Sequence, residues 1–392
     1  GNGVDLVTEI KKKAPGVEII LLTAHGNIPD GVQAIKNGAF DYITKGDDNN
    51  KIIPLISRAV EKARMNIRLD KLEKKVGLMY SFDTILGESK ALKEAVSLAR
   101  KVSVTDVPVL LTGETGTGKE VFAQSIHYNS KRSQQNFVAV NCSSFSKELL
   151  ESEMFGHKAG SFTGALKDKK GLFEEANNGT IFLDEIGEMA FELQAKLLRI
   201  LETGEYIKIG DTKPTRINVR IIAATNRDLP AEIAAGRFRE DLFYRLSVFQ
   251  VHLPPLRERT GDIKILAESF VRSFSEKLSH PVGTITPAYL EALCQQLWKG
   301  NIRELRNAIE RSLIVCEGDC LDVDDLPLEI QNSHYEKSDE GMPGSFELSA
   351  MERRHIARVL EHTKGNKTEA ARLLKIGLTT LYRKIEEYKL GS

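Results

Sequence analysis

One stretch decides the fold of this chain: LLTGETGTGKE, residues 110–120. It follows an apolar segment, opens a helical pattern and fits G-x-x-x-x-G-K. Glycines at this spacing let backbone N–H groups turn toward phosphates, the helix N-terminus adds its dipole, and Lys119 reaches the outer phosphates. A chance glycine-rich turn is the alternative, and the strand–loop–helix context disfavours it. The predicted nucleotide-binding residues are Gly113, Glu114, Thr115, Gly116, Thr117, Gly118, Lys119 and Glu120.

Metal binding requires a second element, because Glu120 stands where a Ser or Thr usually supplies a hydroxyl ligand for Mg²⁺. The stretch TIFLDE, residues 180–185, is an apolar strand that ends in two acids. Asp184 can hold Mg²⁺ and Glu185 can polarise the attacking water, which phosphoryl transfer to water needs. Two acids after a strand could also simply cap the next helix. Paired with the phosphate loop, they favour hydrolysis of a nucleoside triphosphate.

Further polar residues fall where predicted strands end. Asn141 could hold Glu185 away from water when the site is idle, and Thr225 and Asn226 could sense the γ-phosphate; each alone would more often form a turn. Arg239 and Arg245 could make surface ion pairs. In an oligomeric NTPase they would instead enter the neighbour's site, where arginine neutralises charge in the transition state.

Composition restricts the remaining possibilities. The 392 residues predict two to four domains, and Lys plus Arg equal Asp plus Glu at 55 each, so any DNA binding must be local. Four cysteines form no disulfide framework, which suits a reducing compartment, and Cys316 and Cys320 lack the partners of a zinc site. No apolar run is long enough to span a membrane and no signal peptide is present, so we expect a cytoplasmic protein.

The chain has a multidomain α/β organisation. Strands and helices alternate over residues 84–252, helices dominate 253–330, and the polar segment 331–346 is typical of a linker before a helical end, 347–392. The predicted strands of the central domain are Val107–Thr112, Phe137–Asn141, Thr180–Asp184 and Val219–Ala224.

Residues 1–63 give the pattern of part of an α/β domain. The strands Val17–Thr23 and Phe40–Lys45 alternate with helices Ile28–Asn37 and Asp48–Ala63. Apolar residues then continue at helical spacing from Ile56 to Met79, so residues 64–83 are predicted to be a linker helix. Pairing of this helix with a second copy and packing on its own chain both remain open.

The C-terminal segment predicts a helix-turn-helix. Asn366 can cap a short helix, Lys375-Ile376-Gly377 make a turn, and Leu378–Tyr388 form a second helix with Leu378, Leu381 and Ile385 facing inward. A helical hairpin that only dimerises is the alternative. The residues left to contact DNA are Thr379, Thr380, Tyr382, Arg383 and Lys384.

A glycine-bracketed loop, GSFTGA at residues 160–165, carries the resemblance to a known family. The chain resembles bacterial enhancer-binding proteins of the NtrC type, which are sigma-54-dependent activators and response regulators. The loop is similar to the family's GAFTGA motif, with Ser161 in place of Ala, and the resemblance implies that it contacts sigma-54. An ordinary surface loop whose Phe162 folds back is the alternative. The implied contact residues are Gly160, Ser161, Phe162, Thr163, Gly164 and Ala165.

The resemblance also implies roles for residues already singled out. GETGTGKE resembles the family's Walker A motif, which also has a Glu at the position of Glu120. Asp184 and Glu185 resemble the Walker B acids, and Asn141 resembles the switch asparagine. Arg239 and Arg245 are similar to fingers acting in trans, and Arg303 to the sensor II arginine, although Lys299 replaces a usual Pro. The implied folds are a partial flavodoxin-like receiver (1–63), an AAA+ P-loop NTPase domain (84–252) with a helical lid (253–330), and an all-α Fis-type helix-turn-helix (347–392), in which Gly377 replaces a common Ser.

The N-terminal part resembles the second half of a receiver, with Thr23 as its switch Thr and Lys45 as its Lys, and with Gly46 in place of Pro. The phospho-accepting Asp would precede residue 1, so no phosphorylation site is assigned. The resemblance implies ATP and Mg²⁺ as cofactors. It implies as partners sigma-54 RNA polymerase, upstream double-stranded DNA, further copies in a dimer and a hexameric ring, and a sensor histidine kinase, with no membrane.

The predicted function is ATP-driven activation of sigma-54 transcription. Two alternatives are an ATPase that remodels another protein and a DNA-binding repressor with a degenerate ATPase. The GSFTGA loop argues against the first, and intact Lys119, Asp184 and Glu185 argue against the second.

Overall fold

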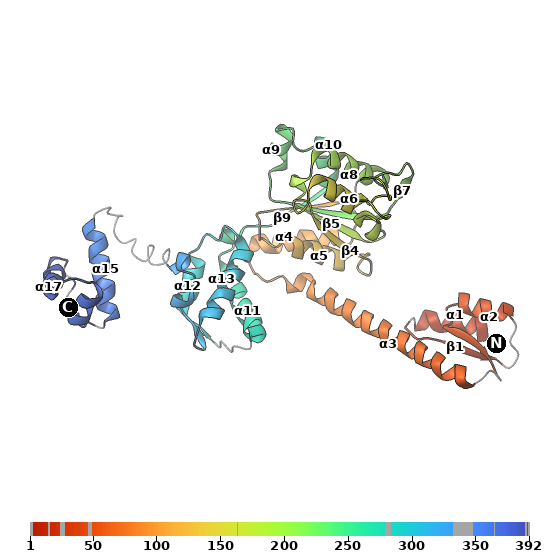
Figure 1. Cartoon of the computed structure of the whole chain (residues 1–392), viewed down its shortest axis with the longest axis horizontal. Helices are drawn as coiled ribbons and strands as arrows, with labels where there is room; N and C mark the ends of the chain where they lie inside the picture. The colour runs from red at the N-terminus through yellow and green to blue at the C-terminus, as the bar shows by residue number, and fades with distance from the viewer. Residues whose placement is uncertain are drawn as a thin grey trace. The chain divides into compact units, whose positions relative to one another are not determined.

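The computed structural model describes residues 3–14, 16–23, 28–45, 49–162, 164–278, 284–331, 348–363, 365–388 and 390. By its contacts the chain forms two compact units, Gly1–Val282 with Leu297–Leu313, and Gly283–Gln296 with Ile314–Ser392. Figure 1 gives the element labels used below.

The N-terminal part contains two parallel strands, β1 (Ile20–Thr23) and β2 (Asp41–Thr44), with helices α1 (Gly3–Lys13) and α2 (Ile28–Lys36). Both predicted strands are confirmed, though each is shorter than expected. Their small core consists of Val4, Val7, Ala34 and Ala39. The helices predicted over Asp48–Ala63 and over residues 64–83 form a single helix, α3 (Asn49–Met79), which contains Pro54. Its residues Ile56, Val60 and Ile67 are exposed and Ala59 is buried.

The central domain is built on one five-stranded parallel sheet in the order β4-β5-β8-β3-β9. The strands are β3 (Val109–Thr112), β4 (Phe137–Asn141), β5 (Thr180–Asp184), β8 (Arg220–Thr225) and β9 (Phe249–His252). The first four were predicted within two residues. Sequence analysis missed β9, which is only four residues long, and the hairpin of β6 (Glu205–Ile207) and β7 (Pro214–Arg216), whose strands are shorter still.

Helices cover both faces of this sheet, as Figure 1 shows. One face packs against α4 (Lys90–Ser103) and α5 (Lys119–Tyr128), with Phe122, Ile126, Phe182 and Ile222 in the core. The other face carries α6 (Lys147–Phe155), α8 (Phe191–Thr203) and α10 (Glu240–Leu246). The short helices are α7 (Leu172–Glu175) and α9 (Leu229–Ala234) and the 3₁₀ turns η1 (Phe82–Thr84), η2 (Ile186–Glu188) and η3 (Leu256–Glu258). Burial on both faces explains why the strands read as continuous apolar runs.

Residues after β9 are mainly helical, as predicted: α11 (Gly261–Leu278), α12 (Pro287–Cys294) and α13 (Asn301–Val315). The structure adds a small parallel pair, β10 (Thr284–Ile285) with β11 (Cys320–Leu321), and a turn η4 (Val323–Asp325).

Three helices form the C-terminal core: α15 (Leu348–His362), α16 (Lys367–Leu373) and α17 (Leu378–Glu387). Asn366 caps α16, as predicted, by accepting a hydrogen bond from the Glu369 N–H. Leu381 and Ile385 are buried in the core with Ile356, Ala370 and Ala371. The prediction that Leu378 faces inward is wrong, because it begins α17 and is 41% exposed.

Candidate functional site

The predicted phosphate loop lies between β3 and α5, at the carboxyl edge of the sheet. Gly118 precedes α5 with φ of 102°, and Gly116 has φ of 80°, a region that side chains with a Cβ rarely adopt. A Cβ on Gly116 would lie 2.2 Å from the Gly300 carbonyl oxygen, so the start of α13 covers this loop closely. Ile302 N–H donates to the Gly116 carbonyl at 3.0 Å. Arg303, the predicted sensor II residue, is exposed one position further on.

Lys119 is 9% exposed, and its ammonium donates to the carbonyls of Gly113 (2.8 Å) and Glu114 (2.9 Å). Burial lowers the pKa of Lys119, and the neighbouring Asp184 opposes that shift. A buried ammonium held only by carbonyls is suited to exchange these partners for phosphate oxygens.

Glu114, a predicted phosphate-loop residue, also contacts the segment that follows β9 and the start of α13. Its carboxylate accepts two bonds from Arg257 (2.7 and 2.8 Å) and one from the buried Asn301 amide (3.1 Å). The hydrogen bond from Arg257 lowers the pKa of Glu114. Thr117 Oγ1 donates to the Glu114 carbonyl, and Thr115 and Glu120 are exposed. Glu114 thus ties the loop to the lid, and Arg257 and Asn301 are contacts that sequence reasoning missed.

The predicted acids and switch residue meet at adjacent strand ends. Asn141 pairs in register with Asp184, and β8 lies between β5 and the phosphate-loop strand. Burial raises the pKa of Asp184, a half-buried carboxylate beside Lys119. Glu185 follows with φ of 52°, a left-handed conformation that is uncommon for a residue other than glycine. Such strain occurs often where a side chain is directed into a site.

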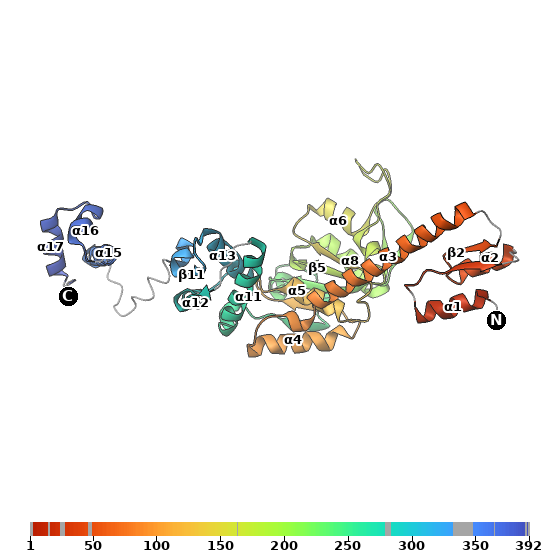
Figure 2. The ribbon, with the colours of Figure 1, turned by 90° about the horizontal axis from the view of Figure 1, so that it is seen from below.

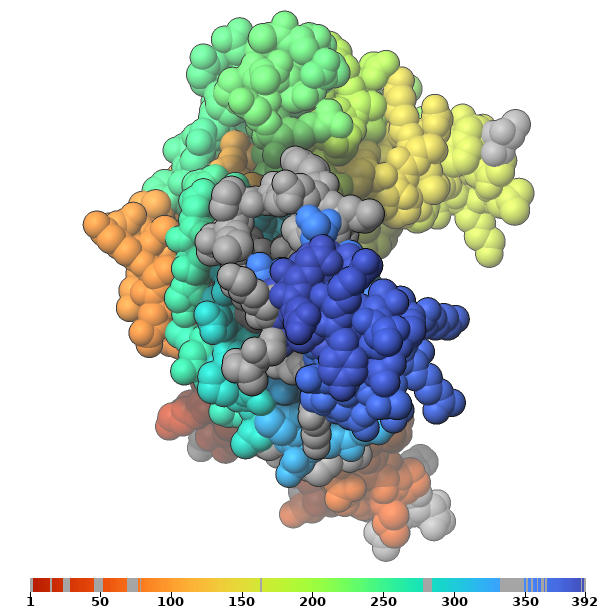
Figure 3. All heavy atoms as spheres, turned by 90° about the vertical axis from the view of Figure 1, so that its left-hand side faces the viewer, coloured from red at the N-terminus to blue at the C-terminus, as the bar shows by residue number. Residues whose placement is uncertain are grey.

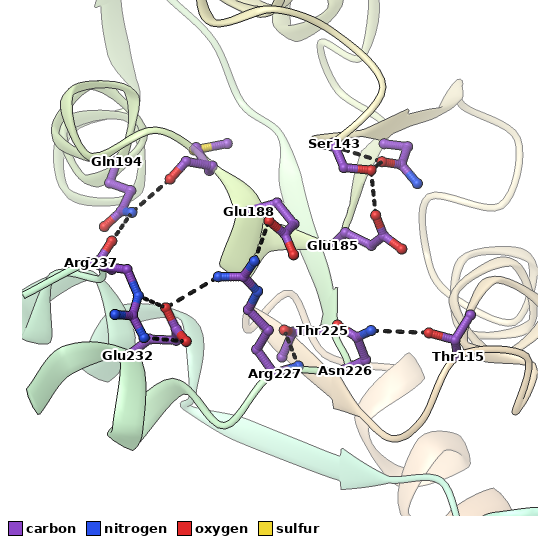
Figure 4. A network of polar contacts seen from close by, with 12 residues as sticks. Thr115, Ser143, Glu185, Glu188, Gln194, Thr225, Asn226, Arg227, Glu232 and Arg237 are labelled. Carbon is purple, nitrogen blue, oxygen red and sulfur yellow. Dashed lines mark hydrogen bonds and ion pairs between the residues drawn. The ribbon is translucent and has the colours of Figure 1, made fainter. Parts of the chain in front are cut away.

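Asn141 reaches Glu185 through a residue that the sequence analysis did not name. The Ser143 hydroxyl lies 2.5 Å from Glu185 Oε2 and 2.8 Å from Asn141 Oδ1, which also accepts the Ser143 N–H (Figure 4). The expected contact of Asn141 with Glu185 is therefore bridged by Ser143.

The predicted sensor residues lie at the end of β8, between β5 and the phosphate-loop strand β3. Asn226 Nδ2 donates to Thr115 Oγ1 at 3.0 Å, so this amide already contacts the phosphate loop. Thr225 is buried and accepts the Arg227 N–H. Arg239 and Arg245 make ion pairs within the chain, with Asp241 (2.7 Å) and Glu202 (3.4 Å).

The GSFTGA loop leaves the domain between α6 and α7. His157 and Lys169 pair at its base, and Asp168 holds the Lys158 ammonium and the Ala159 N–H. In Figure 3 the yellow-green residues around it project from the edge of the domain. Figure 2 shows the same domain from below.

Within this loop, Phe162 is 45% exposed, and its ring makes a T-shaped contact with the His157 ring, with the ring centres 4.9 Å apart. Gly160 and Gly164 have positive φ, Ser161 packs on Gly210, and Ala165 is buried. Thr163 lies outside the described residues.

The predicted DNA-contacting residues lie on α17. Thr379, Tyr382 and Arg383 are exposed and Thr380 is half-buried. The Lys384 ammonium instead donates to Glu352 Oε2 (2.7 Å) on α15 and to the Tyr388 hydroxyl (3.0 Å).

This arrangement defines a class of protein: an AAA+ P-loop ATPase, with phosphate loop, acidic strand end and polar sensor on one parallel sheet edge and a lid over the loop. Family models match it along the chain. The Sigma-54 interaction domain matches residues 85–252, the AAA+ ATPase lid domain 257–342, the Fis family of bacterial regulatory proteins 347–388, and the response regulator receiver domain 1–57.

Relatives agree over nearly the whole chain. It is 40% identical to the regulatory protein AtoC of Escherichia coli, covering 99% of this chain and 85% of that protein, and 36% identical to E. coli NtrC (98% and 86%). The crystal structure of Brucella abortus NtrX with ADP superposes with a TM-score of 0.66 at 31% identity, covering 99% and 86%. The chain belongs to the NtrC-type family of sigma-54-dependent activators, which are response regulators with an ATPase domain and a DNA-binding helix-turn-helix.

Among the described residues, no helix is both long and apolar enough to cross a bilayer.

Proposed function

We propose that this activator uses ATP hydrolysis to convert the closed complex of sigma-54 RNA polymerase with promoter DNA into the open complex. The observation that supports it is the contact of Ser143 with both Glu185 and Asn141 at the ends of β5 and β4. The chain runs from Ser143 directly into α6 (Lys147–Phe155), which precedes the GSFTGA loop. A change at Glu185 on hydrolysis would therefore act on the segment that carries Phe162 and Thr163.

The residues at the sheet edge suit a Mg²⁺-nucleotide. Mg²⁺ is commonly bound by one or two carboxylates together with substrate phosphates, and Asp184 is a half-buried carboxylate without an ion-pair partner among the described residues. When bound, Mg²⁺ would neutralise charge on the phosphates. Lys119 would hold the outer phosphates, Glu185 would orient the water, Asn226 would contact the γ-phosphate, and Arg303 would contact the nucleotide from the lid.

The same proposal includes partners. A dimer binds upstream DNA through α17, and ATPase domains assemble into a hexameric ring in which Arg239 and Arg245 enter the neighbour's site. A sensor histidine kinase controls this activator through its receiver, and the activator acts in the cytoplasm, where promoter DNA and reduced cysteines are found.

Binding of purified sigma-54 in the presence of an ATP transition-state mimic tests the proposal. The chain is compared with Thr163→Ala, and the ATPase rate of both is recorded. We expect a nucleotide-dependent complex that the substitution abolishes while hydrolysis is kept.

A complex that forms without nucleotide, or one that Thr163→Ala leaves intact, would contradict the coupling. If ATP is hydrolysed and no complex forms, another remodelled protein must be sought. Lys167→Ala is a matched control outside the motif, and it should retain the complex.

A further inference from the structure

A buried glutamine lies between the Asp184–Glu185 strand end and the segment that carries the predicted arginine finger Arg239. Gln194 is fully buried in the first turn of α8. Its amide nitrogen donates to the carbonyl of Met189 (2.9 Å) and to the carbonyl of Arg237 (3.0 Å). Its amide oxygen accepts the N–H of Arg239 at 2.8 Å. One side chain therefore bonds the backbone on both sides of Phe238, as Figure 4 shows for its amide nitrogen.

Met189, the first of these partners, lies close after the Asp184–Glu185 strand end. Met189 directly follows η2, the turn that begins after Glu185. In this turn Glu188 N–H donates to the Glu185 carbonyl and Met189 N–H to the Ile186 carbonyl. The carbonyl that Gln194 holds therefore belongs to the fourth residue after Glu185.

A second, parallel connection runs from the predicted sensor. Arg227 follows Asn226 and contacts Glu188 (2.5 Å) and Glu232 (3.3 Å). Glu232, whose side chain is 12% exposed, accepts a two-point contact from Arg237 at 2.6 and 3.0 Å. Both connections meet at Arg237 (Figure 4).

The side chain of Arg239 is also held by α8. Its guanidinium lies over the Phe191 ring, 5.6 Å from the ring centre, and pairs with Asp241. Phe191 and Gln194 are three residues apart and hence lie on one helix face. This face fixes both the backbone and the side chain of Arg239, although Arg239 makes no contact with the nucleotide loop of its own chain among the described residues.

We propose that Gln194, supported by Phe191, is a positioning residue that sets Arg239 for use in the ATP site of a neighbouring copy. Its bond to Met189 couples that position to the state of the subunit's own Glu185. The inference rests on the proposed trans action of Arg239. A finger misplaced by about 1 Å loses on the order of 100-fold in rate, whereas nucleotide binding in the same chain needs no finger.

Mixing two defective full-length chains tests this. Gln194→Ala keeps its own nucleotide site and presents a misplaced finger, whereas Lys119→Ala has a defective site and an intact finger. Alone, Gln194→Ala should lose about 10- to 100-fold in ATPase kcat with KM and ATP affinity close to those of the unaltered chain. Mixed with Lys119→Ala, it should regain activity, because an unaltered site that lies beside a Lys119→Ala copy then meets an intact finger.

The mixture of Arg239→Ala with Lys119→Ala separates the trans action of Arg239 from its positioning by Gln194. If this mixture stays inactive, trans action itself fails. If it recovers while a Gln194→Ala chain that binds ATP normally does not, the positioning role is overturned. Hydrolysis by Gln194→Ala at the unaltered rate would overturn it as well.

A second variant tests the proposal if Gln194→Ala does not fold. Should Gln194→Ala fail to bind ATP, Phe191→Leu takes its place, since Phe191 is 45% exposed and its replacement leaves the α8 core intact. It should lose several-fold in kcat and be rescued by Lys119→Ala in the same way. An unchanged kcat, or a loss that is not rescued, would contradict the proposal.

Discussion

At the scale of single residues, His127 gives the chain a measurable sensitivity to acid. It is fully buried, and its Nδ1 lies 2.9 Å from Thr180 Oγ1. Burial lowers the pKa of His127 to about 4. Between pH 6.5 and 4 the unfolded chain therefore binds a proton that the folded chain excludes, so stability falls as the pH falls through this window.

We expect this residue alone to cost on the order of 3 kcal/mol of unfolding free energy between pH 7 and pH 4. Urea unfolding at several pH values measures it. His127→Gln, which can still bond Thr180, should flatten the dependence. An equally steep dependence in the variant would assign it to other groups.

Arg383 and Lys384 are adjacent basic residues with different surroundings. Arg383 is exposed on α17, whereas Lys384 is bonded to Glu352 and Tyr388. Arg383→Ala should reduce the slope of log K for DNA binding against log salt concentration by about one, because one phosphate contact is lost. Lys384→Met should leave that slope unchanged and lower the melting temperature of the C-terminal helices. Equal slopes for Arg383→Ala and the unaltered chain would exclude a phosphate contact by Arg383.

At the scale of elements, Arg220 joins a strand to a helix end. This β8 residue is 1% exposed and donates to the carbonyls of Val102 and Ser103, which end α4. Burial lowers the pKa of Arg220 to about 10, so it remains charged at neutral pH, where a cation stabilises the negative end of a helix.

Arg220→Met keeps the apolar stem and removes both hydrogen bonds. We expect a loss of about 2–4 kcal/mol in unfolding free energy, because two buried carbonyls lose charged donors. Denaturant unfolding measures it, with the exposed Arg216→Met as the matched control. A loss below about 0.5 kcal/mol, the range of ordinary surface substitutions, would show that water replaces the guanidinium.

At the scale of the whole molecule, nucleotide should stabilise one part and not another. Glu114 and Asn301 join the phosphate loop to the start of α13, whereas α15, α16 and α17 have a core of their own. In calorimetric scans, ATP with Mg²⁺ at 100 times its dissociation constant should stabilise the ATPase domain by about 2.7 kcal/mol. The transition of the C-terminal helices should not move.

Lys119→Ala provides the control, and its ATPase transition should no longer respond. A shift of both transitions by nucleotide would show that the two parts unfold together.

The sequence by itself determined the parallel α/β core, the phosphate loop and the helix-turn-helix. Each depends on local signals: glycines at a fixed spacing, apolar runs that end in Asp184 or Asn141, and the cap at Asn366. Such signals lie within a few residues, so they can be read without knowing which segments meet. The same dependence on local signals explains why β9 was missed and why α3 was predicted as two helices. A strand of four residues is too short to show a clear apolar period, and the apolar residues along α3 do not keep one helical spacing.

Only the tertiary structure decided which polar groups are joined. The contacts of Ser143 with Glu185, of Arg257 with Glu114 and of Gln194 with Arg239 each join segments that are far apart in sequence. Lys384 looks like a free basic residue until α15 brings Glu352 against it. A hydrogen bond needs two atoms at a set distance and angle, and chain folding, not residue type, brings them there.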